Sequence, residues 1–341
     1  MDNKALDIES IGPYLEKHLD AFYGLESYEK FSIGQSNPTF LLKAKSGNYV
    51  LRRKPPGALL KSAHAIDREY RIQDALYKTD VPVAKMLHYC EDISILGVDF
   101  YIMEWVDGIV YEDPSLTQLS NTERELIFKE INRGLASLHN VNIDEVCLSD
   151  YGAKGNYYER QISRWSKQYI SSETEKIEEM DIMMKELPSK IPQDDSQSRL
   201  VHGDFRLDNM IFHKEKPRLL AIIDWEISTT GHPIADLASL IMQWELPAGN
   251  ISRGLQGVDR ISKGIPSNED FINQYCEYRN IDKIKNFNFY LAFCFFRMAA
   301  VIQGVKKRAL EGIAANPERS NQETLSVPKL AKRAFELMEK L

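Results

Sequence analysis

The sequence has few cysteines and no excess of basic charge. Its four cysteines, Cys90, Cys147, Cys276 and Cys294, lie far apart and form no CxxC pair. This spacing argues against a disulfide scaffold or a zinc site and fits free thiols in a reducing cytoplasm. Lys and Arg together number 43 against 50 for Asp and Glu, giving a net charge of −7. We therefore do not expect a nucleic-acid partner, because a general nucleic-acid binder would show a basic excess.

The sequence also lacks a long hydrophobic run. The most apolar stretch, Phe289–Phe296, is much shorter than the about 20 residues that span a bilayer, so it predicts a buried core helix. The polar and acidic start, MDNKALDIES, shows no secretory signal. We expect a cytoplasmic protein with no membrane partner. Its 341 residues allow two domains or one bilobal unit, at about 150 residues per domain.

Two nucleotide-binding motifs are missing as well, the P-loop GxxxxGK[ST] and the Rossmann GxGxxG, so those folds lose their main support. What is present is a strand-rich beginning. Runs of β-forming residues at 28–34, 38–44 and 48–54, separated by turn signals, predict antiparallel hairpins. One helix is expected over 63–78, followed by two strands within 81–90 and 97–106.

Beyond Gly108 the pattern becomes helical. Ser120 and Glu123 form a capping box at the start of a helix, and further helical periods follow. The chain is therefore expected to run from a small β-rich lobe, residues 1–105, to a larger helical lobe, residues 106–341.

Polar residues that suggest chemistry gather in LVHGDFRLDNMIF, Leu200–Phe212, and LLAIIDWE, Leu219–Glu226. The first has the His-x-Asp-x4-Asn spacing of a phosphoryl-transfer loop, in which Asp204 takes the acceptor hydroxyl proton and Asn209 binds Mg²⁺. Asp224 follows an apolar strand, where such enzymes place the main Mg²⁺ ligand. Mg²⁺ prefers a few protein oxygens together with phosphate oxygens. Either motif alone is also explained by a capped turn or a strand end, but together they predict a phosphotransferase that uses ATP and Mg²⁺.

HGDFRLDN together with IIDWE resembles the aminoglycoside phosphotransferase and choline kinase family, relatives of the protein kinases. The resemblance is closer still to the subgroup that occurs alone in bacteria or fused to acyl-CoA dehydrogenase. Further matching stretches are YVLRRKPPG, IDREYRI, FYIMEWVDG and DWEISTTGHPIADLASL. The resemblance covers about the whole chain and implies an α+β, bilobal protein kinase-like fold. Its N-lobe would hold a small antiparallel sheet with one helix, its C-lobe would be larger and mostly helical, and the lobes would form one active-site cleft.

The resemblance implies a set of nucleotide-binding residues. Gly34 would lie in the phosphate-covering loop, and Arg52 would replace the lysine that pairs with the nucleotide. Glu69, on the following helix, would pair with Arg52, and the backbone of Glu104 and Val106 would read adenine. Arginine has a planar, forked guanidinium, whereas lysine carries a point charge, so the two are not interchangeable. We interpret Arg52 as a variant of the site and not as a sign of inactivity. The alternatives are an exposed strand charge at Arg52 and a surface carboxylate at Glu69.

At other positions the resemblance implies structural roles, or the sequence departs from the protein-kinase motifs. The resemblance implies that Asp236 braces the catalytic loop, and that His202 and His139 are packed structural residues. His232 stands where an acidic residue is expected, and we have no physical account of that change. Gly203 replaces the arginine of the HRD motif and no APE segment follows, which argues against a regulated kinase of protein substrates.

The acceptor is the part of the function that the residues define least. Arg206 lies in the catalytic loop, and Arg160, Arg164 and Lys167 share one face of an expected helix. These residues could receive an anionic group, although a solvated basic face explains the helix equally well. With the fusion to acyl-CoA dehydrogenase, they predict an anionic hydroxylated metabolite such as a hydroxyacyl-CoA. The alternatives are an aminoglycoside or amino-alcohol kinase, a nucleotide-binding pseudokinase, and a binding protein without turnover. Oligomeric state has no signature in the sequence.

Overall fold

A computed structural model describes residues 6–31, 37–55, 65–193, 198–249, 252–312 and 326–341. It divides into two compact units, each built from more than one stretch of chain. Unit 1 comprises Met1–Val110, Asp144–Leu148 and Asn209–Ser228, and unit 2 comprises Tyr111–Ile143, Ser149–Asp208 and Thr229–Leu341. The expected division into 1–105 and 106–341 therefore differs from the observed one, because unit 1 also takes the chain that follows the catalytic loop.

The main sheet of unit 1 has five strands in the order β1-β2-β3-β5-β4, with every neighbouring pair antiparallel. The strands are β1 Leu25–Lys30, β2 Thr39–Ala44, β3 Gly47–Arg53, β4 Met86–Cys90 and β5 Phe100–Glu104. The predicted hairpins are confirmed. The strand expected over 28–34 ends at Lys30 instead, and Gly34 lies outside the described residues.

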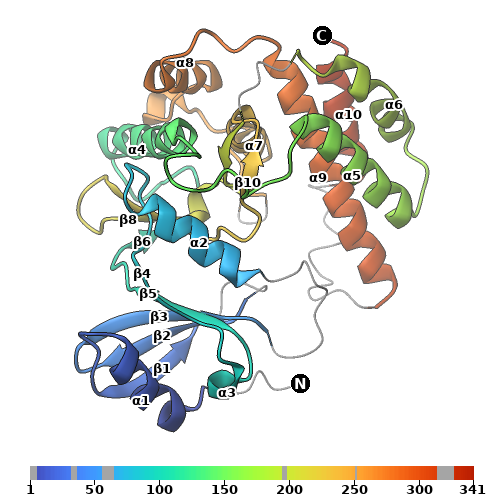
Figure 1. Cartoon of the computed structure of the whole chain (residues 1–341). Coiled ribbons are helices and arrows are strands. Elements are labelled where there is room, and N and C mark those ends of the chain that lie inside the picture. Colours follow the sequence, from blue (N-terminus) through green and yellow to red (C-terminus); the bar gives the residue numbers. More distant parts are fainter. Residues whose placement is uncertain (1–5, 32–36, 56–64, 194–197, 250–251, 313–325) are drawn as a thin grey trace. The chain divides into compact units, whose positions relative to one another are not determined.

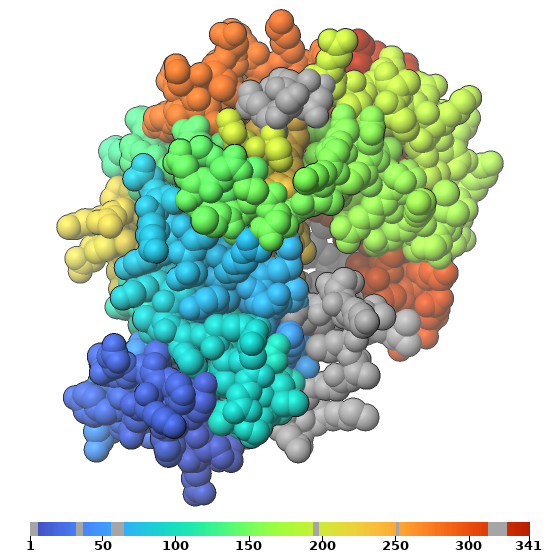
Figure 2. Space-filling view, viewed as in Figure 1, coloured from blue at the N-terminus to red at the C-terminus, as the bar shows by residue number. Residues whose placement is uncertain are grey.

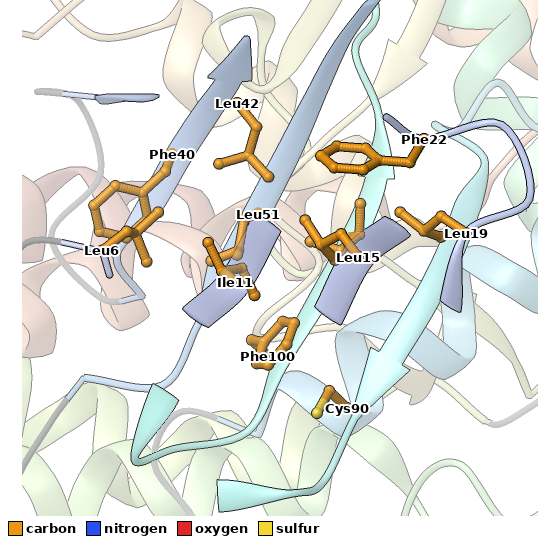
Figure 3. Packing of buried hydrophobic residues seen from close by; sticks show 11 residues of the cluster. Leu6, Ile11, Leu15, Leu19, Phe22, Phe40, Leu42, Leu51, Cys90 and Phe100 are labelled. Carbon is orange, nitrogen blue, oxygen red and sulfur yellow. The ribbon is translucent and has the colours of Figure 1, made fainter. Parts of the chain in front are cut away.

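The described residues of unit 1 form the helices α1 Ile8–His18, α2 Ile66–Leu76 and α3 Ile93–Leu96. The helix expected over 63–78 is α2, whereas α1 and the short α3 were not expected. Asp7 caps α1 by accepting hydrogen bonds from the backbone N–H groups of its first turn. Apolar side chains of α1 and of the residues next to it pack on the main sheet (Figure 3). The buried residues labelled in this cluster are Leu6, Ile11, Leu15, Leu19, Phe22, Phe40, Leu42, Leu51, Cys90 and Phe100.

A second sheet of unit 1 has the order β6-β8-β9, formed by β6 Ile109–Val110, β8 Met210–Phe212 and β9 Leu219–Ile222. Gly108 permits this pairing, since a Cβ atom there would lie 2.4 Å from the Ile211 side chain and from the Phe212 carbonyl oxygen. The β8–β9 hairpin is the element that carries Asn209 and Asp224 at its open end.

Unit 2 is mostly helical, as expected. Its helices are α4 Asn121–Asn140, α5 Tyr157–Ser172, α6 Glu178–Glu186, α7 Ile234–Trp244, α8 Asn268–Arg279, α9 Phe287–Leu310 and α10 Val327–Met338. The antiparallel pair β7 Arg199–Val201 and β10 Thr229–Gly231 accompanies them. The capping box of α4 is confirmed, because Ser120 Oγ accepts from the Glu123 N–H at 3.3 Å and Glu123 accepts from the Ser120 N–H at 2.9 Å.

Helix α9 is the centre of the unit 2 core. It packs against α10, α5 and α7 (Figure 1), and every residue of Phe289–Phe296 is buried, which confirms the predicted core helix. By length and composition alone α9 is sufficient to cross a membrane, but 67% of its most apolar window is buried inside the protein.

Candidate active site

Arg52 is the centre of a charged cluster in unit 1. It lies on β3, opposite Tyr101 of β5 in the sheet register. Its Nε is 2.8 Å from Glu69 Oε2, and its Nη2 is 3.0 Å from Asp224 Oδ1 and 3.6 Å from Glu226 Oε2. The side chain of Arg52 is 14% exposed and that of Glu69 only 2%. The alternatives of an exposed strand charge and a surface carboxylate are therefore wrong, and Arg52, Glu69 and Asp224 come together as one group.

Glu69 is held by neutral donors as well as by Arg52. Asn37 Nδ2 donates to Glu69 Oε1 at 2.7 Å, and the Tyr101 hydroxyl donates to Oε2 at 3.1 Å. Burial raises the pKa of the Glu69 carboxyl, against the opposing charge of Arg52. Burial also raises the pKa of Tyr101 well above its usual value, so the phenol keeps its proton and donates it. Glu69 thus has fixed partners on both carboxylate oxygens.

Replacing Arg52 with lysine tests the need for the planar fork. Lysine offers its three donors from a single nitrogen, so it cannot present the separate Nε and Nη2 donors that Arg52 directs at Glu69 and Asp224, and we expect kcat/KM for ATP to fall about tenfold. Arg53→Lys is the matched control, because Arg53 is the next residue on β3 and its guanidinium lies over the Phe40 ring. ATP-dependent turnover and melting temperature are measured for both. Equal kcat/KM values for R52K and the unmodified protein would contradict the bridging role.

Asn209 and Asp224 lie side by side at the end of the β8–β9 hairpin. The Asn209 carbonyl accepts a hydrogen bond from the Ile223 N–H at 2.9 Å, which holds the two chain segments together one residue before Asp224. Asp224 has φ +67°, in the left-handed region, and such backbone is concentrated at functional sites. Both side chains are partly exposed. The hairpin therefore presents an amide and a carboxylate oxygen from neighbouring residues.

The side-chain oxygens of Asn209 and Asp224 suit Mg²⁺, which needs few protein ligands, better than they suit a metal ion that is coordinated only by protein side chains. Within the described ranges, no group of three His, Cys, Asp or Glu side chains could hold a metal ion. Mg²⁺ is commonly bound by one or two carboxylates together with substrate phosphates and water. Asn209 and Asp224, with Glu226 nearby on the same guanidinium, satisfy that requirement.

The catalytic loop of unit 2 is fixed through its backbone. Asp236, in the first turn of α7 and 1% exposed, accepts from the His202 N–H at 2.6 Å and from the Gly203 N–H at 2.8 Å. Arg297 Nη2 donates to the Gly203 carbonyl at 3.2 Å. Gly203 has φ +86°, a conformation that glycine adopts without strain. The residue directly before Asp204 is therefore held on both sides, and Asp236 is the brace that was predicted.

Arg206 is engaged within the catalytic loop itself. Its Nε and Nη2 both donate to the Asp208 carboxylate, and Arg253 donates to the same carboxylate. Burial opposes ionisation of Asp208, but these two guanidinium groups hold its pKa below the usual value. Arg253 also pairs with Glu112 at 2.7 Å. Arg206, which was predicted to bind the substrate that accepts the phosphate, is thus part of a charged network that the sequence did not reveal.

Arg160 and Arg164, the other two residues predicted to bind the substrate, lie on α5. Arg160 Nη1 donates to the backbone carbonyls of Lys154, at 2.9 Å, and Gly155, so it secures the turn before its own helix. Arg164 is exposed, with its guanidinium 5.3 Å from the centre of the Trp165 ring. In the space-filling view, α5 and α6 lie at the surface of unit 2 (Figure 2). Arg160 therefore has a local structural contact, and the substrate-binding role of both residues stays a prediction.

The predicted hinge follows β5 in unit 1. The Glu104 carboxylate accepts from the Lys85 N–H at 2.9 Å, and the Glu104 N–H donates to the Lys85 carbonyl at 3.0 Å. Val106 is half-buried and packs with the cluster that includes Tyr101. Trp105, between them, stacks against Phe31 with ring centres 6.1 Å apart. Glu104 therefore ends β5 and Val106 follows it by two residues, and the role of both in binding the base stays a prediction.

Sequence reasoning missed several contributors to these groups, and Glu226, Tyr101 and Arg253 show why. Glu226 belongs to the IIDWE motif, two residues after Asp224, and that spacing was a usable signal for a second carboxylate. Tyr101 occupies an ordinary strand position and gave no signal. Arg253 pairs with Asp208 across 45 residues of sequence, and no local pattern points to such a contact.

The sheet with its Arg–Glu pair and the helical unit with its braced loop define a protein of the kinase-like phosphotransferase class. The model of the phosphotransferase enzyme family matches residues 27–263, and the chain belongs to this family. It is 44% identical over 325 residues to mouse acyl-CoA dehydrogenase family member 10, an alignment that covers 93% of this chain and 30% of that protein. The chain thus spans under a third of the length of this relative.

Solved structures agree with the fold. A protein from Ralstonia eutropha, whose name assigns it provisionally to the aminoglycoside phosphotransferases, superposes with a TM-score of 0.90 at 42% identity, covering 98% of this chain and 99% of that one. Spectinomycin phosphotransferase in complex with ADP and spectinomycin superposes with a TM-score of 0.61 at 13% identity, covering 99% of this chain and 100% of that one. The second likeness concerns the fold alone. The expected bilobal kinase-like α+β fold and the resemblance to the family are confirmed.

Proposed function

We propose that this protein is an ATP- and Mg²⁺-dependent phosphotransferase that moves the γ-phosphate of ATP to a hydroxyl of a small molecule. The observation that supports it most is the Arg52–Glu69–Asp224 cluster, because the fold brings together the residues assigned to the nucleotide and to Mg²⁺ from distant parts of the sequence. Family membership supports the reaction class, and the ADP complex of spectinomycin phosphotransferase supports the nucleotide. Four free cysteines are in keeping with the cytoplasm as its place.

In this proposal each residue has a separate task. Arg52, oriented by Glu69, pairs with the nucleotide phosphates, while the backbone of Glu104 and Val106 receives the base. Gly34, which the resemblance assigns to a phosphate-covering loop, lies outside the described residues. Bound Mg²⁺ would neutralise charge on the phosphate oxygens, and its ligands would be Asn209 and Asp224.

Asp204 accepts the proton in the transfer step. As the acceptor oxygen forms its bond to the γ-phosphorus, the hydroxyl proton passes to the Asp204 carboxylate. The bond between the γ-phosphorus and the β,γ-bridging oxygen breaks, and ADP leaves with that electron pair. Because the transition state is loose, placement of Asp204 by the braced loop matters more than its basicity.

We further propose an anionic hydroxylated acceptor, such as a hydroxyacyl-CoA. Arg164 is exposed on α5, Arg160 contacts only backbone carbonyls in the bonds described above, and Arg206 shares Asp208 with Arg253. We infer that these guanidinium groups receive an anionic group, and the relative named for acyl-CoA dehydrogenase suggests a thioester context. The specific alternative is an aminoglycoside, favoured by the name of the Ralstonia eutropha structure.

A panel of acceptors separates these possibilities. Purified protein is given Mg²⁺-ATP with hydroxyacyl-CoA thioesters, with aminoglycosides or with amino alcohols, and both ADP formation and the phosphorylated product are measured. We expect phosphorylated product with the thioesters only. Product with aminoglycosides alone would overturn the acceptor proposal. A thermal shift with Mg²⁺-ATP but no product from any compound would indicate a pseudokinase or a binding protein.

A further inference from the structure

A buried chain of hydrogen bonds runs from α8 to α7 inside unit 2. Arg279 Nη1 donates to the Tyr275 hydroxyl oxygen at 2.9 Å. That hydroxyl is 2.7 Å from His139 Nδ1, and His139 Nε2 is 3.3 Å from Asp236 Oδ2. Tyr275 and His139 are 0% exposed and Asp236 is 1% exposed. The chain is therefore shielded from water along its length, where each hydrogen bond counts most.

The partners decide where each proton lies. Arginine only donates, so the Tyr275 oxygen accepts from Arg279 and its own O–H is left for His139 Nδ1. Burial lowers the pKa of His139, so the ring is neutral and carries one N–H. That N–H is on Nε2, because the other tautomer would set an Nε2 lone pair against the Asp236 carboxylate.

The end of this chain is the catalytic loop. Asp236 receives the His139 N–H and also the two backbone N–H groups that precede Asp204. Burial opposes its ionisation, but hydrogen bonding to His139, with a contribution from His202, holds the pKa of Asp236 below its usual value. A change at Tyr275 therefore reaches the loop through only two intervening side chains.

We propose that Tyr275, oriented by Arg279, is a positioning residue for Asp204. It keeps the proton of His139 on Nε2 and so keeps Asp236 fixed on the catalytic loop. Tyr275 itself touches no reacting atom. Only the kinetic part of the following test rests on the proposed function, because the structural part is measured on the protein without substrate.

The test compares Tyr275→Phe with Tyr169→Phe. Tyr169 is also 0% exposed, and its hydroxyl finds no hydrogen-bond partner among the residues that the structure describes, so its removal is a matched control. In Y275F we expect hydrogen exchange of peptides spanning 200–207 to be about fivefold faster, and unchanged in Y169F. We expect kcat for Mg²⁺-ATP consumption to fall about tenfold in Y275F, with KM for ATP within about twofold.

A merely structural role would give a different result. Y275F would then melt at a lower temperature, but its exchange at 200–207 and its kcat per folded molecule would equal those of Y169F, and the proposal would be overturned. If Y275F does not fold, Arg279→Lys repeats the comparison, since it keeps the charge and alters the donor held against Tyr275. Unchanged exchange in R279K would likewise overturn the proposal. Lack of turnover in the unmodified protein would count against the proposed function and leave the exchange result to decide.

Discussion

Replacing Asp204 with asparagine is expected to lower kcat for phosphoryl transfer by about a thousandfold, while the KM for ATP changes by less than about threefold. Asparagine keeps the size of the side chain and cannot take up the hydroxyl proton. The backbone before residue 204 is held by Asp236 and Arg297, so the loop should keep its conformation. Product formation under saturating ATP measures the change directly.

The control for this variant is Asp282→Asn. Asp282 is an exposed carboxylate of the same unit, on the turn between α8 and α9, and its replacement should leave kcat within about twofold. If D204N turned over as fast as D282N, the proton would be accepted elsewhere and the assignment of Asp204 as the base would be wrong.

Replacing Asp224 with asparagine is expected to lower kcat by about a hundredfold or more, and to raise the Mg²⁺ concentration that gives half-maximal activity. The substitution removes the negative charge that favours a divalent cation. It also removes one of the carboxylates that face Arg52. Asparagine tolerates the left-handed backbone about as well as aspartate does, so the hairpin should stay folded. A Mg²⁺ titration of ATP turnover is the measurement.

Asp224→Ala separates charge from backbone conformation. Alanine at φ +67° adds a conformational cost of about 1 kcal/mol, so D224A should melt at a lower temperature than D224N, with a similar loss of turnover. If D224N kept the Mg²⁺ dependence of the unmodified protein, Asp224 would have no part in binding the metal.

Most residues of the candidate site could be predicted because they belong to short sequence motifs whose residue types and spacing indicate a reaction. The spacing of Asp204, Asn209 and Asp224 predicted the reaction class, and the family resemblance of the YVLR strand implied Arg52. Burial was not readable, since Arg52 stands beside Arg53 and Lys54 in a run that also suits an exposed strand. Only tertiary packing shows that Glu69 is 2% exposed and that the two form a buried pair.

Contacts between distant segments account for what could not be predicted. Helix α1 was missed because its apolar residues are few and Pro13 interrupts its pattern, while packing on the main sheet stabilises it. The hydrogen bond between His139 and Tyr275 joins residues 136 positions apart. No local propensity or spacing predicts such a bond, which depends on how α4 and α8 pack.

The β8–β9 hairpin determines which fragments of this chain can contain the complete charged cluster around Arg52. Unit 1 is completed by Asn209–Ser228, which the ribosome makes long after the main sheet. A fragment that stops at residue 110 would carry Arg52 and Glu69 without Asn209 or Asp224, and so only part of the charged cluster. Arg52 and Glu69 therefore meet Asp224 only in a chain that continues through this hairpin.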